Sequence, residues 1–409
     1  MPIDMYENLY GEKEIKMKKS ILVTVFLVIA ILVASCGGGT QGGANAPIKI
    51  GVIYNVTGGQ ASLDVPSYNG AKLAAKQINE AGGVLGRQIQ IVFYDGKSDA
   101  TVIGNAATQL VDTDKVVAMM GFSDSDMALA AAPIAAKAGI VFVTSGATSP
   151  KLPDQVPDYL FLAAFGDNVQ AAAGAEYAFN TLKYKTVFLL TDQGTEYTKL
   201  LSKYFKERYT ELGGQVTLED SYQTGDKDFS AQITKLKGAA TQPDFLYIAA
   251  QPDDIGTIVK QFRDSGIDKA IMGGDGYDTP LLVQIPGKGA TNVYFTTHSL
   301  MDKDVGSDPV KKFITDYQAE YNTPPENAFA ALGYDTMRLI ADAISRAKST
   351  DLKAIHDALA ATKDFPGITG TLSYPAGSRV PQKGVSMILV KDQKLTLAAE
   401  VVPEKIPAP

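Results

Sequence analysis

The stretch PIKIGVIYNVTGGQASLDVPSYNGAKLAAKQINEAGGVLGRQIQIVFY, residues 47–94, decides the fold. Its compact apolar run over 48–54 predicts a buried strand. An amphipathic helix is predicted over 68–81, and Gly82-Gly83 supplies the stop signal at its end. A second strand is predicted over 88–94. Two strands joined by a helix are typical of a parallel sheet that carries its helices on the faces.

The same alternation continues along the chain. Further helices are predicted over 101–111, 127–138, 168–182, 196–212, 229–238 and 254–265. Further strands are predicted over 116–121, 140–144, 186–191, 215–222, 245–249 and 270–273. Short apolar strands that alternate with helices indicate parallel sheets covered on both faces. Two α/β units of similar size are the simplest account of a chain of 409 residues.

Composition excludes several classes of function. The formal net charge of −7 argues against a nucleic-acid partner, which requires a basic face. One cysteine and two histidines exclude a cysteine-rich zinc site and an intrachain disulfide, and we expect no metal site. His356 lies in a polar helical stretch and is expected at the surface. His298 follows a strand-like run and is a candidate to line a cleft.

The N-terminal region resembles an export signal. An apolar run over 21–33 follows Lys18-Lys19 and is shorter than the roughly 20 residues of a spanning helix. An uncleaved membrane anchor is the alternative. The small residues before Cys36, in Val33-Ala34-Ser35-Cys36, resemble a bacterial lipobox, in which cleavage precedes the cysteine and its thiol carries a lipid.

The leader therefore divides into two predicted segments. Residues 1–35 are predicted to be a signal peptide, with Met17 as a second candidate start. Residues 36–46 are Gly-rich and predict a flexible tether anchored by lipid at Cys36. We expect export across the cytoplasmic membrane, with the protein held at the outer face of that membrane or in the periplasm.

Catalytic motifs are absent from the sequence. The glycines of 82–86 have the wrong spacing for a dinucleotide site, and 287–289 lacks the rest of a P-loop. The run 121–125 lacks the second glycine of a nucleophile elbow. A catalytic pair of carboxylates is not excluded, because the sequence contains many acidic residues. We expect a binding protein rather than an enzyme, with no cofactor.

Ligands of open α/β sheets bind beyond the carboxyl ends of the strands. The loops at these ends carry many of the hydroxyl and carboxylate groups that interrupt the apolar rhythm. They cover residues 55–59, 122–126, 145–149, 192–197, 251–253 and 274–278. The same residue types also form turns and helix caps, so that the set of loops carries more weight than any one of them.

The exported part, about residues 47–402, resembles the type I periplasmic-binding-protein family. Within it, the chain is similar to the leucine/isoleucine/valine-binding proteins of branched-chain amino-acid ABC importers. The resemblance rests on KIGV at 49–52, GAKLA at 70–74, INEAGGVLGR at 78–87, ATSP at 147–150 and GDKDFS at 225–230.

The resemblance implies an α/β fold with two Rossmann-like lobes joined by three crossovers. Lobe one would cover 47–166 plus 297–370, and lobe two 167–296 plus 371–402. Such proteins close on their ligand like a hinged trap.

The resemblance also assigns binding residues. Ser125 would take the ligand carboxylate, and Thr148 would contact both the carboxylate and the ammonium. Gly146 would offer its carbonyl group. Tyr197 would cover the ligand, and Asp275 would neutralise its ammonium.

Two departures from the family pattern affect the site. Gln251 occupies a position that is often aromatic, which predicts a more polar side-chain pocket. Ser98 and Asp124 stand where the family commonly has a disulfide of the first lobe.

The resemblance therefore implies an extracytoplasmic solute-binding lipoprotein of an ABC importer that binds an amino acid, branched-chain or related. One alternative is a sensory receptor that uses the same trap, and another is a ligand with a carboxylate but no amine, such as an aromatic acid. The expected partners are a small molecule, a membrane permease and, through the lipid, the membrane. We expect a monomer.

Overall fold

The computed structural model describes residues 46–409, of which residues 47–409 form one compact unit. The predicted signal peptide, Cys36 and nearly all of the tether lie outside the described residues. Within residues 46–409, none of the helices combines the length and the apolar character that crossing a membrane requires.

The first sheet has five parallel strands in the order β2-β1-β3-β4-β5. These strands are β1 (Ile48–Tyr54), β2 (Ile89–Asp95), β3 (Ala118–Gly121), β4 (Phe142–Thr144) and β5 (Leu160–Leu162). The strands β3, β4 and β5, which follow β1 in the order of the sheet, are buried along their whole length. This is expected for a parallel sheet covered on both faces.

Helices cover both faces of this sheet and complete lobe one. One face packs against α2 (Ala61–Glu80), α12 (Ala328–Ala347) and α13 (Leu352–Ala360). The other face packs against α3 (Ala100–Gln109) and α4 (Ser125–Lys137). Shorter or outer elements are a π-helical turn (Leu110–Asp114), α5 (Leu152–Gln155), α11 (Asp308–Tyr321) and the strand pair β11 (Phe365–Gly367) and β12 (Gly370–Leu372).

Two glycines let α2 and α12 pack with their backbones in contact. A Cβ at Gly70 would stand 1.8 Å from the Ala330 carbonyl oxygen, and one at Gly333 would stand 1.9 Å from that of Ser67. No side chain fits at such distances. The close pairing brings α12, which is remote in sequence, beside α2 and therefore beside the cleft.

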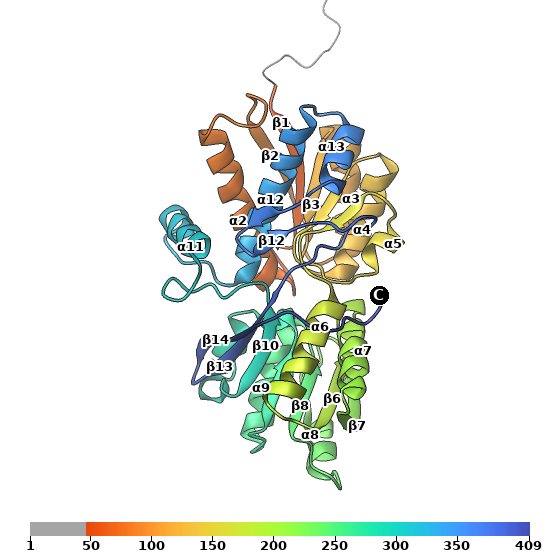
Figure 1. Cartoon of the computed structure of the whole chain (residues 1–409), viewed down its shortest axis with the longest axis vertical. Helices are drawn as coiled ribbons and strands as arrows, with labels where there is room; N and C mark the ends of the chain where they lie inside the picture. Colours follow the sequence, from red (N-terminus) through yellow and green to blue (C-terminus); the bar gives the residue numbers. More distant parts are fainter. Residues whose placement is uncertain (1–45) are drawn as a thin grey trace, which may run out of the picture. The chain divides into compact units, whose positions relative to one another are not determined.

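The second sheet has seven strands in the order β14-β13-β10-β9-β8-β6-β7. They are β6 (Thr186–Asp192), β7 (Gln215–Tyr222), β8 (Phe245–Ala249), β9 (Ala270–Gly273), β10 (Val293–Thr297), β13 (Val385–Lys391) and β14 (Lys394–Val401). The last two strands come from the C-terminal part of the chain: β13 pairs antiparallel with β10, and β14 pairs antiparallel with β13, at the edge of the sheet labelled in Figure 1. The sequence analysis predicted neither of them.

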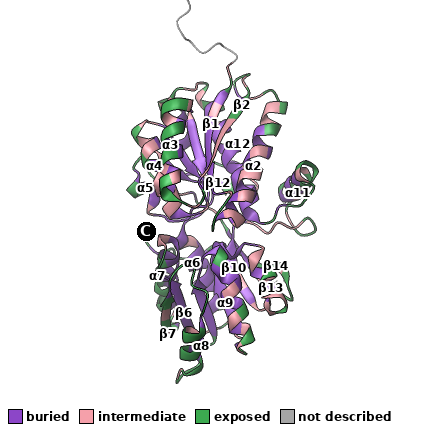
Figure 2. Cartoon of the chain, turned by 180° about the vertical axis from the view of Figure 1, so that it is seen from behind, coloured by how far each residue is buried: buried purple, intermediate pink, exposed green. Residues whose placement is uncertain are grey.

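Lobe two is completed by helices on both faces of this sheet. The faces pack against α6 (Asp167–Glu176) with α7 (Glu196–Glu211), and against α8 (Ser230–Lys237) with α9 (Pro252–Asp264). Short helical segments are Tyr177–Thr181, Asp275–Tyr277, α10 (Leu281–Gln284) and Gly287–Gly289. Figure 2 shows that central strands such as β1 and β6 are almost entirely buried, whereas the outward faces of several helices are exposed.

The chain passes between the sheets three times: between β5 and α6, between β10 and α12, and between β12 and β13. The predicted fold class, two Rossmann-like α/β lobes with three crossovers, is therefore confirmed. The exact residue boundaries of the lobes stay a prediction.

Most predicted elements lie within a few residues of the observed ones, but the helix predicted over 68–81 begins too late. Helix α2 starts at Ala61 and includes Pro66, which has no N–H to donate to the carbonyl of Ser62. The amide of Asn327 donates to that carbonyl instead, at 3.0 Å. A tertiary contact therefore satisfies the group that would otherwise oppose a proline inside the helix.

Candidate functional site

The strand ends of the two sheets meet at a small, almost filled cavity between the lobes, with a volume of about 10 Å³. Loops after β1, β3, β6, β8 and β9 reach it, as the strand-end rule predicts. Its lining residues come from both lobes: Gln60, Leu63, Ser123, Asp124, Tyr197, Gln251, Pro252, Asp275, Gly276 and Phe329.

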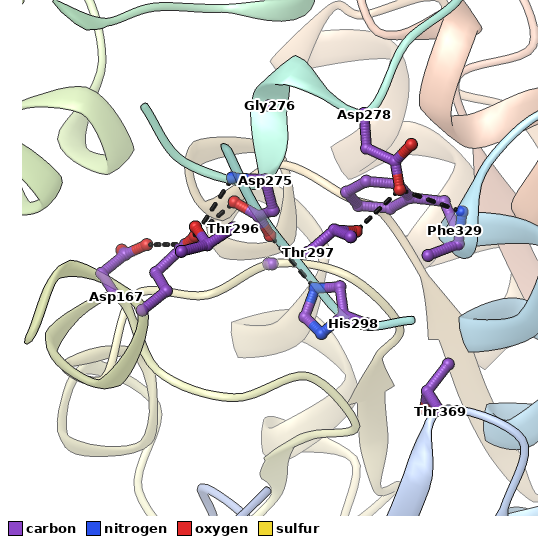
Figure 3. Close-up of polar contacts among 12 residues, drawn as sticks. Asp167, Asp275, Gly276, Asp278, Thr296, Thr297, His298, Phe329 and Thr369 are labelled. Carbon is purple, nitrogen blue, oxygen red and sulfur yellow. Dashed lines mark hydrogen bonds and ion pairs between the residues drawn. The ribbon is translucent and has the colours of Figure 1, made fainter. Parts of the chain in front are cut away.

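Asp275 is held in this cavity by three side chains. Its Oδ1 accepts a hydrogen bond from the Gln170 amide at 2.8 Å and another from the Tyr197 hydroxyl at 3.0 Å. Its Oδ2 lies 3.1 Å from Nε2 of His298, as Figure 3 shows. The Tyr197 hydroxyl in turn accepts from the N–H of Gly276 at 2.9 Å. These contacts fix the orientation of the carboxylate from within lobe two and the crossover beside it.

His298 stands directly behind Asp275. The residue is 3% exposed, and its ring stacks on Phe165 and meets Phe329 edge-on. Burial lowers the pKa of the imidazole, although Asp275 opposes this effect. The neutral ring donates through Nε2 to the carboxylate, while Nδ1 has no hydrogen-bond partner within residues 46–409. His298 thus supports the lining of this cavity without belonging to it, and it lines a separate pocket together with Thr369 and Ser386.

Asp167 is a second buried acid close to Asp275. The amide of Gln170 bridges the two, because its Nε2 also donates to Asp167 Oδ1, at 3.0 Å. Burial raises the pKa of Asp167 well above its ordinary value, and the charge of Asp275 adds to this effect. Both influences favour protonated Asp167 and so limit the negative charge beside Asp275.

The wall that lobe one contributes is organised by Asp64 on α2. This buried side chain accepts from the Asn55 N–H at 2.8 Å, and from the Asn55 amide and the Ser123 N–H at 2.9 Å each. It therefore ties the loop after β1 to the loop after β3. Burial raises the pKa of Asp64 to about 7.

Asp124 lies in the same wall and is less completely paired. Its Oδ1 caps α4 by accepting from the Met127 N–H at 3.1 Å. Its Oδ2 has only long contacts, 3.5 Å from each of the amides of Gln60 and Gln251. Burial, and to a smaller extent the charge of Asp126, raise the pKa of Asp124 to about 6.

Hydrogen bonds between the lobes close the outer side of the cavity. The Gln60 amide donates to Gln251 Oε1 at 3.0 Å. At the N-terminus of α7, the Glu196 N–H donates to the Asp126 carboxylate at 3.1 Å, and the Glu196 carboxylate accepts from the Ser149 hydroxyl at 2.8 Å. These contacts join the two lobes in a closed arrangement.

The structure brings together three of the six predicted ligand-binding residues. Tyr197, Gln251 and Asp275 all line the cavity. Ser125 and Thr148 are buried, but neither lines it. The Ser125 hydroxyl accepts from the Ser149 N–H at 3.1 Å, and the Thr148 carbonyl accepts a backbone hydrogen bond from the first residue of α6.

Gly146 stands directly behind the lining. A Cβ at this position would lie 2.7 Å from the Phe329 ring and 3.2 Å from the Cα of Ser123. Only glycine therefore lets these two lining residues approach the loop after β4. The ligand roles of all six residues stay predictions.

Three lining residues, Gln60, Leu63 and Phe329, and the supporting residue Gln170 were not predicted from the sequence. Gln60 and Leu63 were missed because the late start of the predicted helix left residues 60–67 unassigned. Phe329 lies in the first turn of α12, and no helix was predicted in this part of the chain. Asn327 before an apolar periodic run is a helix N-cap signal that would have located it.

Two further sequence expectations concern the same region. Ser98 and Asp124, the positions of the family's disulfide, both line the outer crevice of the cleft. Within residues 46–409, no group of three or more histidine, cysteine, aspartate or glutamate residues is placed to hold a metal ion.

Comparison with known proteins agrees with this geometry. The family model of the periplasmic binding proteins matches residues 47–394. Leu/Ile/Val-binding protein homolog 3 of Brucella melitensis is 31% identical over 341 residues, which cover 82% of this chain and 89% of that protein. The leucine-, isoleucine-, valine-, threonine- and alanine-binding protein of Pseudomonas aeruginosa is 28% identical, over 80% of this chain and 85% of that one.

A solved structure is similar over the whole described fold. It is the branched-chain amino acid transporter substrate binding protein LivJ of Streptococcus pneumoniae, in complex with isoleucine. Its TM-score is 0.82 at 35% sequence identity, with 87% of this chain and 100% of that chain covered. The chain therefore belongs to the periplasmic binding protein family, and within it to the type I proteins of branched-chain amino-acid transport.

Proposed function

We propose that this chain is the extracytoplasmic solute-binding protein of an ABC importer and that it captures an amino acid, branched-chain or related, between its lobes. The observation that carries the proposal is the position of Asp275. This acid is 2% exposed, lines the cavity and is oriented by Tyr197, Gln170 and His298.

An amino acid fits such an acid for a physical reason. Its ammonium group has three donors and no acceptor, and it needs an acidic partner once water is removed. A ligand with a carboxylate but no amine would instead meet Asp275 as a like charge. The amino-acid ligands named for the relatives, isoleucine in the case of LivJ, agree with the first option.

The other end of the amino acid is assigned to the loops after β3 and β4. Ser125 is the first residue of the 13-residue helix α4, whose N-terminus favours negative charge. Its hydroxyl accepts from Ser149, so its own hydrogen is available for the ligand carboxylate. In this proposal Thr148 assists, Gly146 offers its carbonyl to the ammonium and Tyr197 covers the ligand.

Calorimetry with an amino acid and its des-amino analogue tests the ligand class. Protein that has been unfolded and refolded to remove any co-purified ligand should bind the amino acid at least tenfold more tightly. Mass spectrometry of the denatured protein should also identify an amino acid among the released compounds. Preference for the des-amino compound, or for an aromatic acid such as benzoate, would refute the proposal.

The anchor and the importer are part of the same proposal. Cleavage before Cys36 and lipidation of its thiol would hold the protein at the membrane, where a permease collects the ligand. A Cys36→Ser variant should leave the membrane fraction, and deletion of the permease should abolish uptake while binding persists. If uptake is unchanged without any ABC permease but a ligand-dependent signalling response is lost in the absence of this chain, the trap serves as a sensory receptor.

A further inference from the structure

The lining of the cavity is chemically divided. Tyr197, Gly276 and Asp275 form the charged end described above. Leu63, Pro252 and Phe329 are its apolar members. Of the four remaining polar residues, Ser123 lines the cavity alone. The other three line both the cavity and the crevice outside it: Gln60, Asp124 and Gln251. These three residues therefore form the wall that separates the cavity from the crevice, and we call them the polar gate.

The polar gate is assembled from both lobes. Gln60 and Asp124 belong to the loops of lobe one, whereas Gln251 is the N-cap of α9 in lobe two. The Gln60 amide donates to Gln251 Oε1 at 3.0 Å, and the Gln251 amide donates to the Thr195 hydroxyl at 2.9 Å. All three gate residues are nearly buried, with exposures of 9%, 5% and 4% for Gln60, Asp124 and Gln251.

Within the described part of the chain, the oxygen acceptors of the polar gate are not all matched by well-placed N–H or O–H donors. Asp124 Oδ2 has only the two amide contacts at 3.5 Å, which is the outer limit for a hydrogen bond. The side-chain oxygen of Gln60 accepts from no group within residues 46–409, although this oxygen is not completely buried. A buried acceptor without a good donor destabilises the closed state unless the ligand supplies that donor.

We propose that the side chain of the bound amino acid carries a neutral hydrogen-bond donor, a hydroxyl or a carboxamide, and that the polar gate recognises it. This inference rests on the proposed function, because it takes the ammonium to lie at Asp275. The hydroxyl or amide donates to Asp124 Oδ2 or to the oxygen of Gln60. A carboxamide side chain can also accept from the amide of Gln251.

A neutral side chain fits the gate better than a cationic one. The Asp124 carboxylate already lies at the N-terminus of α4 as its cap, and the amides of Gln60 and Gln251 face it. A purely aliphatic side chain would leave the gate acceptors unpaired as the lobes close. Recognition therefore requires a donor rather than a full positive charge or an apolar surface.

Two pairs of ligands of similar shape test the inference on the unmodified protein. Threonine and valine differ by a hydroxyl in place of a methyl group, and asparagine and leucine differ mainly by a carboxamide in place of an isopropyl group. Calorimetry should show threonine bound about tenfold more tightly than valine, and asparagine about tenfold more tightly than leucine. Lysine should bind more weakly than asparagine.

A substitution in the gate sharpens the test. Gln251→Leu should reduce both preferences about tenfold or reverse them, because the wall then presents an apolar side chain. Gln193→Leu is the matched control, since Gln193 is an exposed glutamine outside the cavity lining. It should leave both ratios unchanged.

Each outcome decides the inference separately from the proposed function. Tighter binding of valine and leucine by the unmodified protein would overturn the inference and leave amino-acid capture intact. Tighter binding of lysine would also overturn it, in favour of a cationic side chain. Binding of no amino acid at all would overturn both proposals. The wild-type ratios decide the question even if the Gln251 variant fails to fold.

Discussion

The two walls of the cleft differ in how their acids are held. In lobe two, Asp275 accepts three side-chain hydrogen bonds of 2.8–3.1 Å that involve no residue of the lobe-one wall. In the lobe-one wall, one oxygen of Asp124 has only contacts of 3.5 Å, and one of these comes from Gln251 across the cleft. The first acid is oriented locally, and the second completes its surroundings only when the lobes meet.

The two walls therefore serve different purposes within one small cavity. A group that recognises the charge common to all amino acids benefits from a fixed orientation, because ordering it during binding would reduce affinity. A group that distinguishes one side chain from another can be assembled during closure, because the wrong side chain then leaves it unpaired. The predictions below test whether the two walls behave in these different ways.

The largest effect is expected from Asp275→Asn, which removes the charge of the lobe-two wall. A buried ammonium would lose its acidic partner, and affinity for an amino acid should fall more than tenfold, by about 2–5 kcal/mol. Calorimetry measures this loss. Asp253→Asn is the control, because Asp253 is exposed in the outer crevice and does not line the cavity. Equal affinities for the two variants would remove Asp275 from the site.

A smaller effect is expected from His298→Ala, which removes one of the three groups that orient Asp275. Loss of this donor should weaken amino-acid binding by about 1–3 kcal/mol. The ratio of affinities for the amino acid and its des-amino analogue should fall as well, because His298 acts on the ammonium through Asp275. His298→Gln supplies an amide donor and should recover part of the loss. A ratio that stays constant in His298→Ala would indicate a purely structural role.

The next effect concerns the pH dependence of stability, which we attribute in part to the buried carboxylate of Asp278. Its Oδ2 accepts from the Thr297 hydroxyl at 2.7 Å and from the Ala328 N–H, at the start of α12, at 3.1 Å. Burial raises the pKa of Asp278 to about 6 in the folded protein. The unfolded chain releases this proton near its ordinary pKa, about 4.

The folded state therefore binds more protons than the unfolded state between about pH 4 and pH 6. The stabilisation that this proton provides is fully present below pH 4 and is lost as the pH rises through 6. The free energy of unfolding of the wild type should therefore fall between pH 4 and pH 7. In Asp278→Asn this fall should be smaller by about 1–2 kcal/mol. Urea unfolding at the two pH values measures it. An unchanged decrease would show that the buried Asp278 does not titrate in this range.

The smallest effect is expected from Glu196→Ala, which breaks bonds between the lobes outside the cavity. The carboxylate accepts from the Ser149 hydroxyl at 2.8 Å and from the Gln155 amide at 3.3 Å. Its loss should weaken binding of every ligand by the same factor, about 0.5–1.5 kcal/mol, mainly through faster dissociation. Stopped-flow kinetics with several ligands tests this, with Glu207→Ala on the exposed side of α7 as control. A factor that varies among ligands would place Glu196 in direct contact with them.

Much of the fold could be predicted because its parallel strands are short, apolar and separated by helix patterns. The strands over 215–222, 245–249 and 270–273 have their predicted bounds. Periodicity placed the start of α2 at residue 68, whereas the helix begins at Ala61 and includes Pro66, with a hydrogen bond from Asn327 to the Ser62 carbonyl. The pairing of β13 with β10, and of β14 with β13, could not be predicted from the sequence either, because these strands carry no local signal for their neighbour in the sheet.

The class of the protein and the loops that form its site follow from local sequence patterns. A parallel sheet brings the carboxyl ends of its strands to one edge, so strand positions alone locate Tyr197, Gln251 and Asp275 there. Only the tertiary structure decided what those loops face. Phe329 reaches the cavity because Gly70 and Gly333 let α12 pack against α2. His298 supports Asp275 because the crossover after β10 buries its ring against Phe165. Such contacts join residues far apart in sequence, and their energies depend on burial and distance, which no local pattern encodes.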